Sequence, residues 1–95
     1  MKQYGYHERK PDLVARLKRI EGQVRGLRRM VEDDTYCIDI LTQISAATSA
    51  LRKVAVGLLE DHISHCVAEG AAGSEAEGRR MVQEANAAIN RLVSS

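Results

Sequence analysis

The sequence lacks the large aromatic side chains that fill many protein cores. It has no Trp and no Phe, and only three Tyr among its 95 residues. The interior must therefore be built from Leu, Ile, Val, Ala and Met, which suits packing between helices better than a sandwich of sheets. A single Pro, with glycines that fall mostly near or inside expected helices, leaves few turn signals for β-hairpins. These absences predict one all-α domain.

Long apolar runs and a disulfide framework are also missing. The longest apolar stretch, around Val54–Leu59, is much shorter than the roughly 20 residues that span a bilayer. The start of the chain, MKQYGYHERKP, is polar and charged, unlike a secretory signal. Two cysteines do not make a disulfide framework. We therefore expect a cytoplasmic protein with no membrane partner, whose reduced thiols are available to soft metals.

Negative charge is scarce in the first third of the chain. Residues 1–30 hold nine Lys or Arg and three Asp or Glu, a net charge of +6, whereas residues 31–95 hold five and ten, a net charge of −5. A basic first helix on a slightly acidic body favours a polyanionic partner such as nucleic acid. The alternative is a charged helix face that is merely solvated.

Apolar residues at helical spacing predict the first helix. Pro11 suits its first turn, and apolar side chains then recur at intervals of three and four residues: Leu13, Leu17, Ile20, Val24, Leu27 and Val31. Arg16 and Arg19 flank this apolar seam on one edge. We expect the helix to end at residues 32–35. Residues 1–10 are predicted to form a mobile basic arm, and residues 11–95 a single all-helical domain.

The same spacing predicts a second, longer helix over residues 36–66. Its seam consists of Cys37, Leu41, Ile44, Thr48, Leu51, Ala55, Leu58 and His62. A helix of about 30 residues is roughly 45 Å long, and a chain of this size leaves part of it uncovered unless chains associate. A Gly-, Ala- and Ser-rich loop is expected over Glu69–Gly78. The apolar face of a shorter third helix follows, formed by Met81, Val82, Ala85, Ile89 and Leu92.

Three candidate metal ligands lie on the second helix. His62 and Cys66 are four residues apart, so both can reach one ion from the same helical face. Cys37 is 25 positions before His62, which corresponds to roughly 37 Å along a straight helix. If all three residues bind one ion, Cys37 must come from another, antiparallel copy of the chain. Small residues near Ala50, midway between the ligands, would let two such copies cross closely. This interpretation predicts a site that exists only in an oligomer.

Two thiolates and one imidazole form a soft ligand set of low coordination number. Such a set favours Cu(I), whereas zinc, the main competitor, usually takes four ligands. A zinc site could add water, His65 or a carboxylate. His65 is otherwise a bystander or a group that lies around the ligands, and His7 lies in the expected arm. The alternatives are a cysteine buried as a small core residue and a histidine at the surface or at a helix end. No phosphate-binding Gly-rich loop and no Ser–His–Asp or Cys–His arrangement is evident, so we expect no enzymatic activity.

Three segments resemble the copper-sensing operon repressors. They are RLKRIEGQVRG at residues 16–26, YCIDILTQISA at residues 36–46 and EDHISHC at residues 60–66. The resemblance extends from about residue 8 to residue 93. It implies an all-helical protein that dimerises through antiparallel helices and pairs into a flat tetramer. It also implies a repressor that binds operator DNA when metal-free and releases it on binding Cu(I), so that copper efflux or sequestration genes are derepressed.

The resemblance also implies roles for individual residues. Cys37 of one protomer, with His62 and Cys66 of another, would form a trigonal Cu(I) site, and Tyr36 and Glu84 would lie around those ligands. Arg16 and Lys53 match basic positions used for DNA in the family. We add Arg19 and Arg52 as their charged neighbours.

Other members of the family sense different signals. Nickel- and cobalt-sensing relatives have His in place of Cys66 and recruit an amino-terminal His, and persulfide-sensing relatives lack the counterpart of His62. Both differences favour copper for this chain. The alternatives are a cytosolic metal-buffering oligomer and a sensor of zinc or nickel on the same scaffold.

Overall fold

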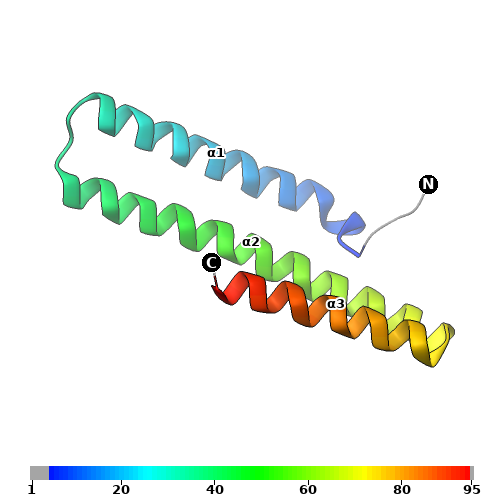
Figure 1. Cartoon of the computed structure of the whole chain (residues 1–95). Coiled ribbons are helices and arrows are strands. Elements are labelled where there is room, and N and C mark those ends of the chain that lie inside the picture. Colours follow the sequence, from blue (N-terminus) through cyan, green and yellow to red (C-terminus); the bar gives the residue numbers. More distant parts are fainter. Residues whose placement is uncertain (1–4, 95) are drawn as a thin grey trace. The chain divides into compact units, whose positions relative to one another are not determined.

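The computed structural model describes the backbone of residues 5–94, and the side chains of residues 5–65 and 73–94. A short 3-10 helix, η1 (His7–Arg9), precedes three α-helices: α1 (Lys10–Glu32), α2 (Cys37–Ala72) and α3 (Glu75–Ser94) (Figure 1). No strand occurs in this described part of the chain, and the predicted all-α class is confirmed. None of its helices combines the length and apolar character that crossing a membrane requires.

The turn between α1 and α2 stops the first helix with backbone hydrogen bonds. The Thr35 amide donates to the Met30 carbonyl at 2.9 Å, and the Asp34 amide donates to the Val31 carbonyl at 3.2 Å. This pair of bonds forms a Schellman motif, which satisfies carbonyls at the end of a helix. The motif places Asp34 in the left-handed region, with a φ of 55°. The predicted break at residues 32–35 is therefore correct, and an aspartate occupies the position that glycine favours.

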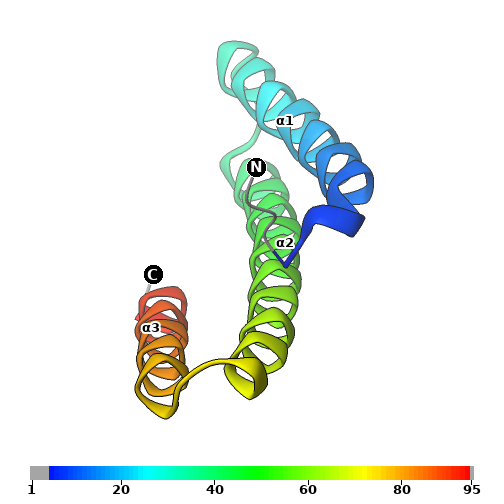
Figure 2. The same ribbon diagram turned by 90° about the vertical axis from the view of Figure 1, so that its right-hand side faces the viewer.

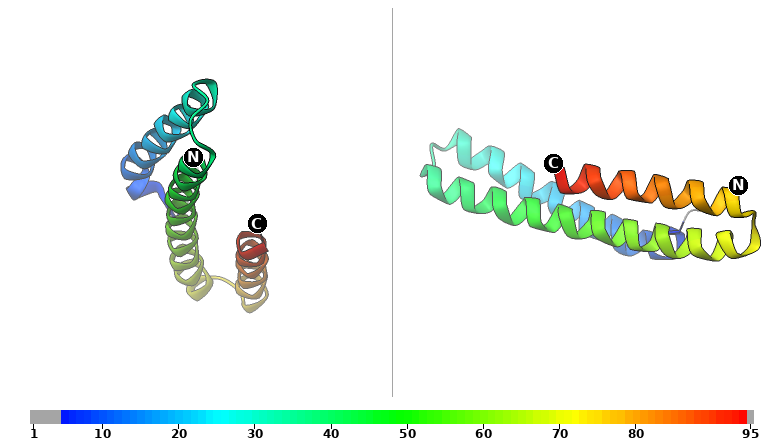
Figure 3. Two further views of the ribbon diagram at one scale, coloured as in Figure 1. Left: turned by 90° about the vertical axis from the view of Figure 1, so that its left-hand side faces the viewer. Right: turned by 60° about the horizontal axis from the view of Figure 1, so that its bottom comes forward.

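Residues Lys10–Val54 form one of two compact units, here named the hairpin unit. In it α1 lies antiparallel to the first half of α2 (Figures 1 and 3). Its buried side chains are Leu13, Ile20, Ala47 and Val54. Leu13 and Ile20 belong to the predicted seam of α1. On α2, however, the face packed against α1 carries Ala47 and Val54, and the predicted α2 seam is not part of this core.

The second unit contains η1 and the chain from Ala55 onward. In it α3 runs antiparallel to the second half of α2 (Figure 2). Of the predicted α3 face, Ala85 is buried and Met81, Ile89 and Leu92 are partly buried. Val82 is 58% exposed, so its assignment to this face was wrong. Val82 lies about 100° around the helix axis from Met81, at the margin of the buried surface of α3, where its side chain stays exposed.

The predicted loop over Glu69–Gly78 was too long. The backbone of α2 stays helical through Ala72, and α3 begins at Glu75. The Glu77 amide donates to Ser74 Oγ at 3.1 Å, which caps the amino terminus of α3. A Ser followed three residues later by Glu is a helix-start signature that the sequence interpretation did not use. Alanines ahead of the turn favour helix over loop.

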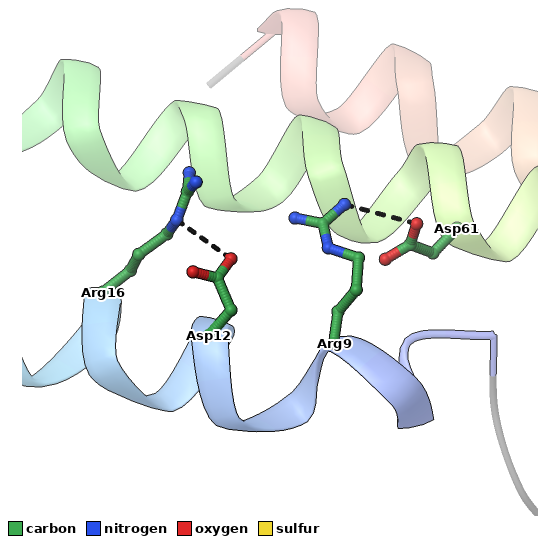
Figure 4. Close-up of polar contacts among 4 residues, drawn as sticks. All are labelled: Arg9, Asp12, Arg16 and Asp61. Carbon is green, nitrogen blue, oxygen red and sulfur yellow. Dashed lines mark hydrogen bonds and ion pairs between the residues drawn. The ribbon is translucent and has the colours of Figure 1, made fainter.

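Residues 5–9 pack against α2 within the second unit. Arg9 forms an ion pair with Asp61, with 3.3 Å between Nη1 and Oδ1 (Figure 4). Glycines make this approach possible: a Cβ at Gly57 would lie 3.2 Å from the Arg9 guanidinium, and a Cβ at Gly5 would overlap the Asp61 backbone. Residues 1–4 of the predicted arm lie outside the described residues, and Lys10 already belongs to α1. The boundaries and the mobility of the arm remain predictions.

Replacing Asp34 with Gly is expected to stabilise the protein. An L-residue in the left-handed region costs about 1–2 kcal/mol, of which the greater chain entropy of Gly offsets part. We expect the free energy of unfolding of Asp34→Gly to rise by roughly 0.5–1 kcal/mol, as measured by denaturant unfolding at fixed protein concentration.

Asp33→Gly is the matched control, because it removes the same side chain one residue earlier. Within the described residues Asp34 is the one non-glycine with a positive φ, so glycine at position 33 adds flexibility without relieving strain. We expect this variant to be destabilised. Equal effects at both positions would contradict the strain assigned to Asp34.

Candidate functional site

Cys37 is the first residue of α2, and its thiol is free and exposed. Tyr36, directly before it, is 69% exposed. The short turn after α1 therefore presents a thiol and a phenol at the solvent-facing start of a long helix. An exposed thiol argues against the alternative that Cys37 is a small core residue.

His62 lies one helical turn before Cys66 on the same helix. His62 is partly buried in the second unit, and the Cys66 side chain lies outside the described residues. The turn is also anchored at Asp61, whose Oδ1 accepts the hydrogen bond from Arg9. The other oxygen of this carboxylate, Oδ2, is buried without a hydrogen-bond partner. The second half of α2 therefore holds His62 beside an anchored carboxylate.

The structure does not bring the candidate ligands together within one chain. Cys37 and His62 belong to one continuous helix, 25 residues apart, and each helical residue adds about 1.5 Å. Among the described side chains, no three of His, Cys, Asp or Glu lie close enough to hold a common metal ion. Glu84 lies exposed on α3. The ligand set, with Tyr36 and Glu84 around it, remains a prediction that needs a second chain.

Three of the four candidate DNA-binding residues line one groove of the hairpin unit. This basic groove has a volume of about 540 Å³ and lies between α1 and the first half of α2. Arg16 and Arg19 line it from α1, and Lys53 lines it from α2. Arg52, also exposed on α2, is not among its lining residues. The structure therefore separates Arg52 from the other three candidates.

Sequence reasoning missed one acidic member of the basic groove. Asp12 lines the groove and forms an ion pair with Arg16, with 3.2 Å between Oδ2 and Nε (Figure 4). The signal was present in the sequence, because residues four apart on a helix are neighbours. Gln23 and Ser49 add neutral polar groups to the same lining.

A second, smaller groove of the hairpin unit is almost wholly apolar. Its volume is about 220 Å³, and its lining comprises Ile20, Val24, Leu27, Ile44, Ala47, Thr48 and Leu51. Val24, Ile44 and Leu51 are each between 43% and 54% exposed. Ile20 is the one residue that lines both grooves. The hairpin unit thus separates a charged surface from an uncovered apolar one.

Comparison with known families identifies the architecture. The model of the metal-sensitive transcriptional repressors matches residues 9–91, which include every candidate metal and DNA residue. The chain belongs to the metal-sensitive transcriptional repressor family. The copper-sensing transcriptional repressor RicR of Mycobacterium tuberculosis is 56% identical over 94 residues, which cover 97% of this chain and 96% of RicR.

Solved structures of family members share the fold. The copper-sensing repressor CsoR of Geobacillus thermodenitrificans, crystallised with Cu(I), gives a TM-score of 0.82 at 45% identity and covers 98% of this chain and 93% of its own. The nickel-responsive transcriptional regulator InrS gives a TM-score of 0.75 at 36% identity, over 86% of this chain and 90% of its own. These repressors are transcriptional regulators rather than enzymes. A copper-sensing and a nickel-responsive regulator therefore share this helical scaffold.

Proposed function

We propose that this protein is a copper(I)-responsive transcriptional repressor of the cytoplasm. Metal-free, it binds operator double-stranded DNA; on binding Cu(I) it releases the DNA, and copper efflux or resistance genes are derepressed. The observation that carries the proposal is the pairing of an exposed thiol at the start of α2 with a His-x3-Cys turn far along the same helix. The similarity to RicR and CsoR supports copper as the metal.

The ligand chemistry supports copper over harder ions. Cys37 and Cys66 offer thiolates and His62 an imidazole, and this set suits Cu(I). These three residues would hold the ion, and Cu(I) bound there would supply a soft Lewis-acid centre. InrS has the same fold and responds to nickel, so nickel is the second candidate; its preference for geometries of higher coordination fits two thiolates and one imidazole less well.

The ligand spacing calls for an antiparallel dimer. When two α2 helices cross near Ala50, Cys37 of one chain lies beside His62 and Cys66 of the other. The uncovered apolar side chains of the hairpin unit supply a surface for this contact: Leu17, Val24, Val31, Leu41, Ile44 and Leu51. An exposed apolar patch of this kind marks an interaction site. We infer that two such dimers pair into a flat tetramer, as the family resemblance implies.

The basic groove offers a surface for the DNA backbone. Arg16, Arg19 and Lys53 can neutralise phosphates, and Arg52 adds a further exposed positive charge on α2 outside the groove lining. The hairpin lacks a protruding recognition helix, so recognition is expected to rest on phosphates and groove shape more than on base edges. The affinity for DNA should fall steeply with salt.

The metal site and the DNA surface share one mechanical element. Helix α2 carries Cys37, Lys53 and His62. Joining the start of one α2 to the far end of its partner restrains both helices and, we infer, moves the basic grooves out of register with the duplex. This coupling is reciprocal, so operator DNA must weaken Cu(I) binding by the same factor.

A charge placed on the apolar surface should dissociate the oligomer. Leu51 is half-exposed in the single chain, and Leu51→Glu would bury a carboxylate in the proposed contact, which is strongly unfavourable. Sedimentation velocity should show Leu51→Glu as a smaller species than the wild type.

Thr42→Glu is the matched control. Thr42 is exposed on the same helix, outside the apolar set, so the new carboxylate should stay solvated and leave the oligomer intact. A wild-type sedimentation coefficient for Leu51→Glu would contradict the proposed interface.

A gel shift with operator DNA tests the regulation. We expect one equivalent of Cu(I) per chain to weaken DNA binding by at least about tenfold, which corresponds to about 1.4 kcal/mol of coupling. Ni(II) and Zn(II) at the same concentration should have smaller effects. Unchanged DNA affinity with copper bound would reject the mechanism, and a larger response to Ni(II) would favour the nickel alternative.

A double substitution distinguishes a DNA-binding repressor from a protein that only buffers metal. Arg16→Ala with Lys53→Ala should reduce DNA affinity by 10-fold or more, on the order of two lost phosphate contacts, while the Cu(I) stoichiometry stays at the wild-type value. Lys18→Ala with Arg29→Ala removes the same charge from exposed positions of α1 outside the groove lining and should have a smaller effect. Equal losses of affinity in the two variants would reject the basic groove as the DNA surface.

A further inference from the structure

The basic groove contains one carboxylate among its cationic side chains. Arg16, Arg19 and Lys53 line the groove, and Asp12 lines it beside Arg16. The Arg16 Nε lies 3.2 Å from Asp12 Oδ2, and the side chains are 47% and 54% exposed. The guanidinium therefore lies beside an anionic oxygen (Figure 4), and both side chains remain about half exposed to solvent.

The other lining groups are donors that suit phosphate oxygens. A guanidinium presents several N–H donors in a fixed fork, and an ammonium adds a point charge. The Gln23 amide and the Ser49 hydroxyl, which also line the groove, can donate neutral hydrogen bonds. The Asp12 Oδ2 atom lies beside the Arg16 Nε, where a phosphate oxygen would otherwise bind.

We propose that the basic groove is a phosphate-binding site, here named the phosphate seat. In it the Asp12 carboxylate competes with phosphate for the Arg16 guanidinium. Without phosphate, Asp12 holds the Arg16 guanidinium; an arriving phosphate oxygen takes the place of the carboxylate. The identification of that phosphate with the DNA backbone rests on the proposed function. Free inorganic phosphate is the other source with the same chemistry.

Displacing the Asp12 carboxylate from Arg16 costs little free energy. Exposed ion pairs within one helix are weak, so a phosphate can displace the carboxylate. The displaced carboxylate remains nearby and repels the phosphate, which lowers the affinity of the seat. Because backbone phosphates carry no sequence information, Asp12 lowers the affinity for every duplex alike. Asp12 thereby keeps the affinity for DNA low enough for the protein to release the duplex.

The first test measures inorganic phosphate binding by phosphorus NMR titration of the metal-free, full-length protein. We expect Asp12→Asn to bind phosphate about fivefold more tightly than the wild type, as expected for removing a neighbouring like charge near the surface. Asp12→Glu, which keeps the charge, should behave like the wild type. Circular dichroism verifies that each variant retains its helices.

Glu21→Gln is the matched control. Glu21 also lies on α1 and pairs with an arginine four residues later, at 3.6 Å from Arg25 Nη2, but it does not line the groove. Its substitution changes the net charge equally, so it should tighten phosphate binding much less. In an Arg16→Ala background, the gain from Asp12→Asn should shrink to that of Glu21→Gln.

The second test repeats the series with operator DNA and with an unrelated duplex of equal length. We expect Asp12→Asn to tighten binding to both duplexes by the same factor. If Asp12→Asn and Glu21→Gln have equal effects on phosphate and on DNA, the seat is rejected. A gain for inorganic phosphate alone would support the seat and reject the DNA backbone as its occupant. If the affinity of the wild type for DNA does not change with Cu(I), the proposed function is rejected, but the result for inorganic phosphate is unaffected.

Discussion

The continuity of α2 is the constraint on which the molecule depends. The helix runs without a break from Cys37 to Ala72, and a straight helix keeps its two ends apart because each residue advances a fixed 1.5 Å. A thiol at the first residue therefore cannot share an ion with a histidine seven turns later in the same chain. The same length leaves apolar side chains uncovered along the hairpin unit. Both consequences favour the proposed association with a second chain, which would complete the ligand set and cover the apolar surface.

The hairpin unit carries two distinct surfaces. Leu13, Ile20, Ala47 and Val54 form the small core that joins α1 to α2. On one side the basic groove collects the cations, and on the other the apolar groove exposes aliphatic side chains. Because both surfaces belong to the same pair of helices, a change in how two chains meet also changes how their cations are arranged. In the proposed function, this arrangement would provide a physical route from metal binding to DNA release.

Much of the fold could be predicted from the sequence, and the reasons are local. The seam of α1 and the break near Asp34 follow from periodicity and turn chemistry, and the resemblance to a repressor family agrees with the match over residues 9–91. The loop before α3 was misplaced because its glycines outweighed the Ser74 cap and the helix-forming alanines. The Asp12–Arg16 pair was overlooked because only the basic side chains were placed around the helix, without their acidic neighbours. The metal ligands stay a prediction, since in the proposed site they come from two chains.

The central claim is that each metal site takes residues from two chains, and a mixing experiment tests it most directly. Chains carrying Cys37→Ser and chains carrying His62→Ala are co-expressed with different tags, and the mixed oligomer is purified and titrated with Cu(I) against a competing chelator. One intact site per two chains is predicted in the mixed oligomer. That site takes Cys37 from the His62→Ala chain and His62 with Cys66 from the Cys37→Ser chain, whereas the other site lacks both Cys37 and His62. Neither parent should hold copper at that strength. A mixed oligomer that binds no more copper than its parents would contradict the account.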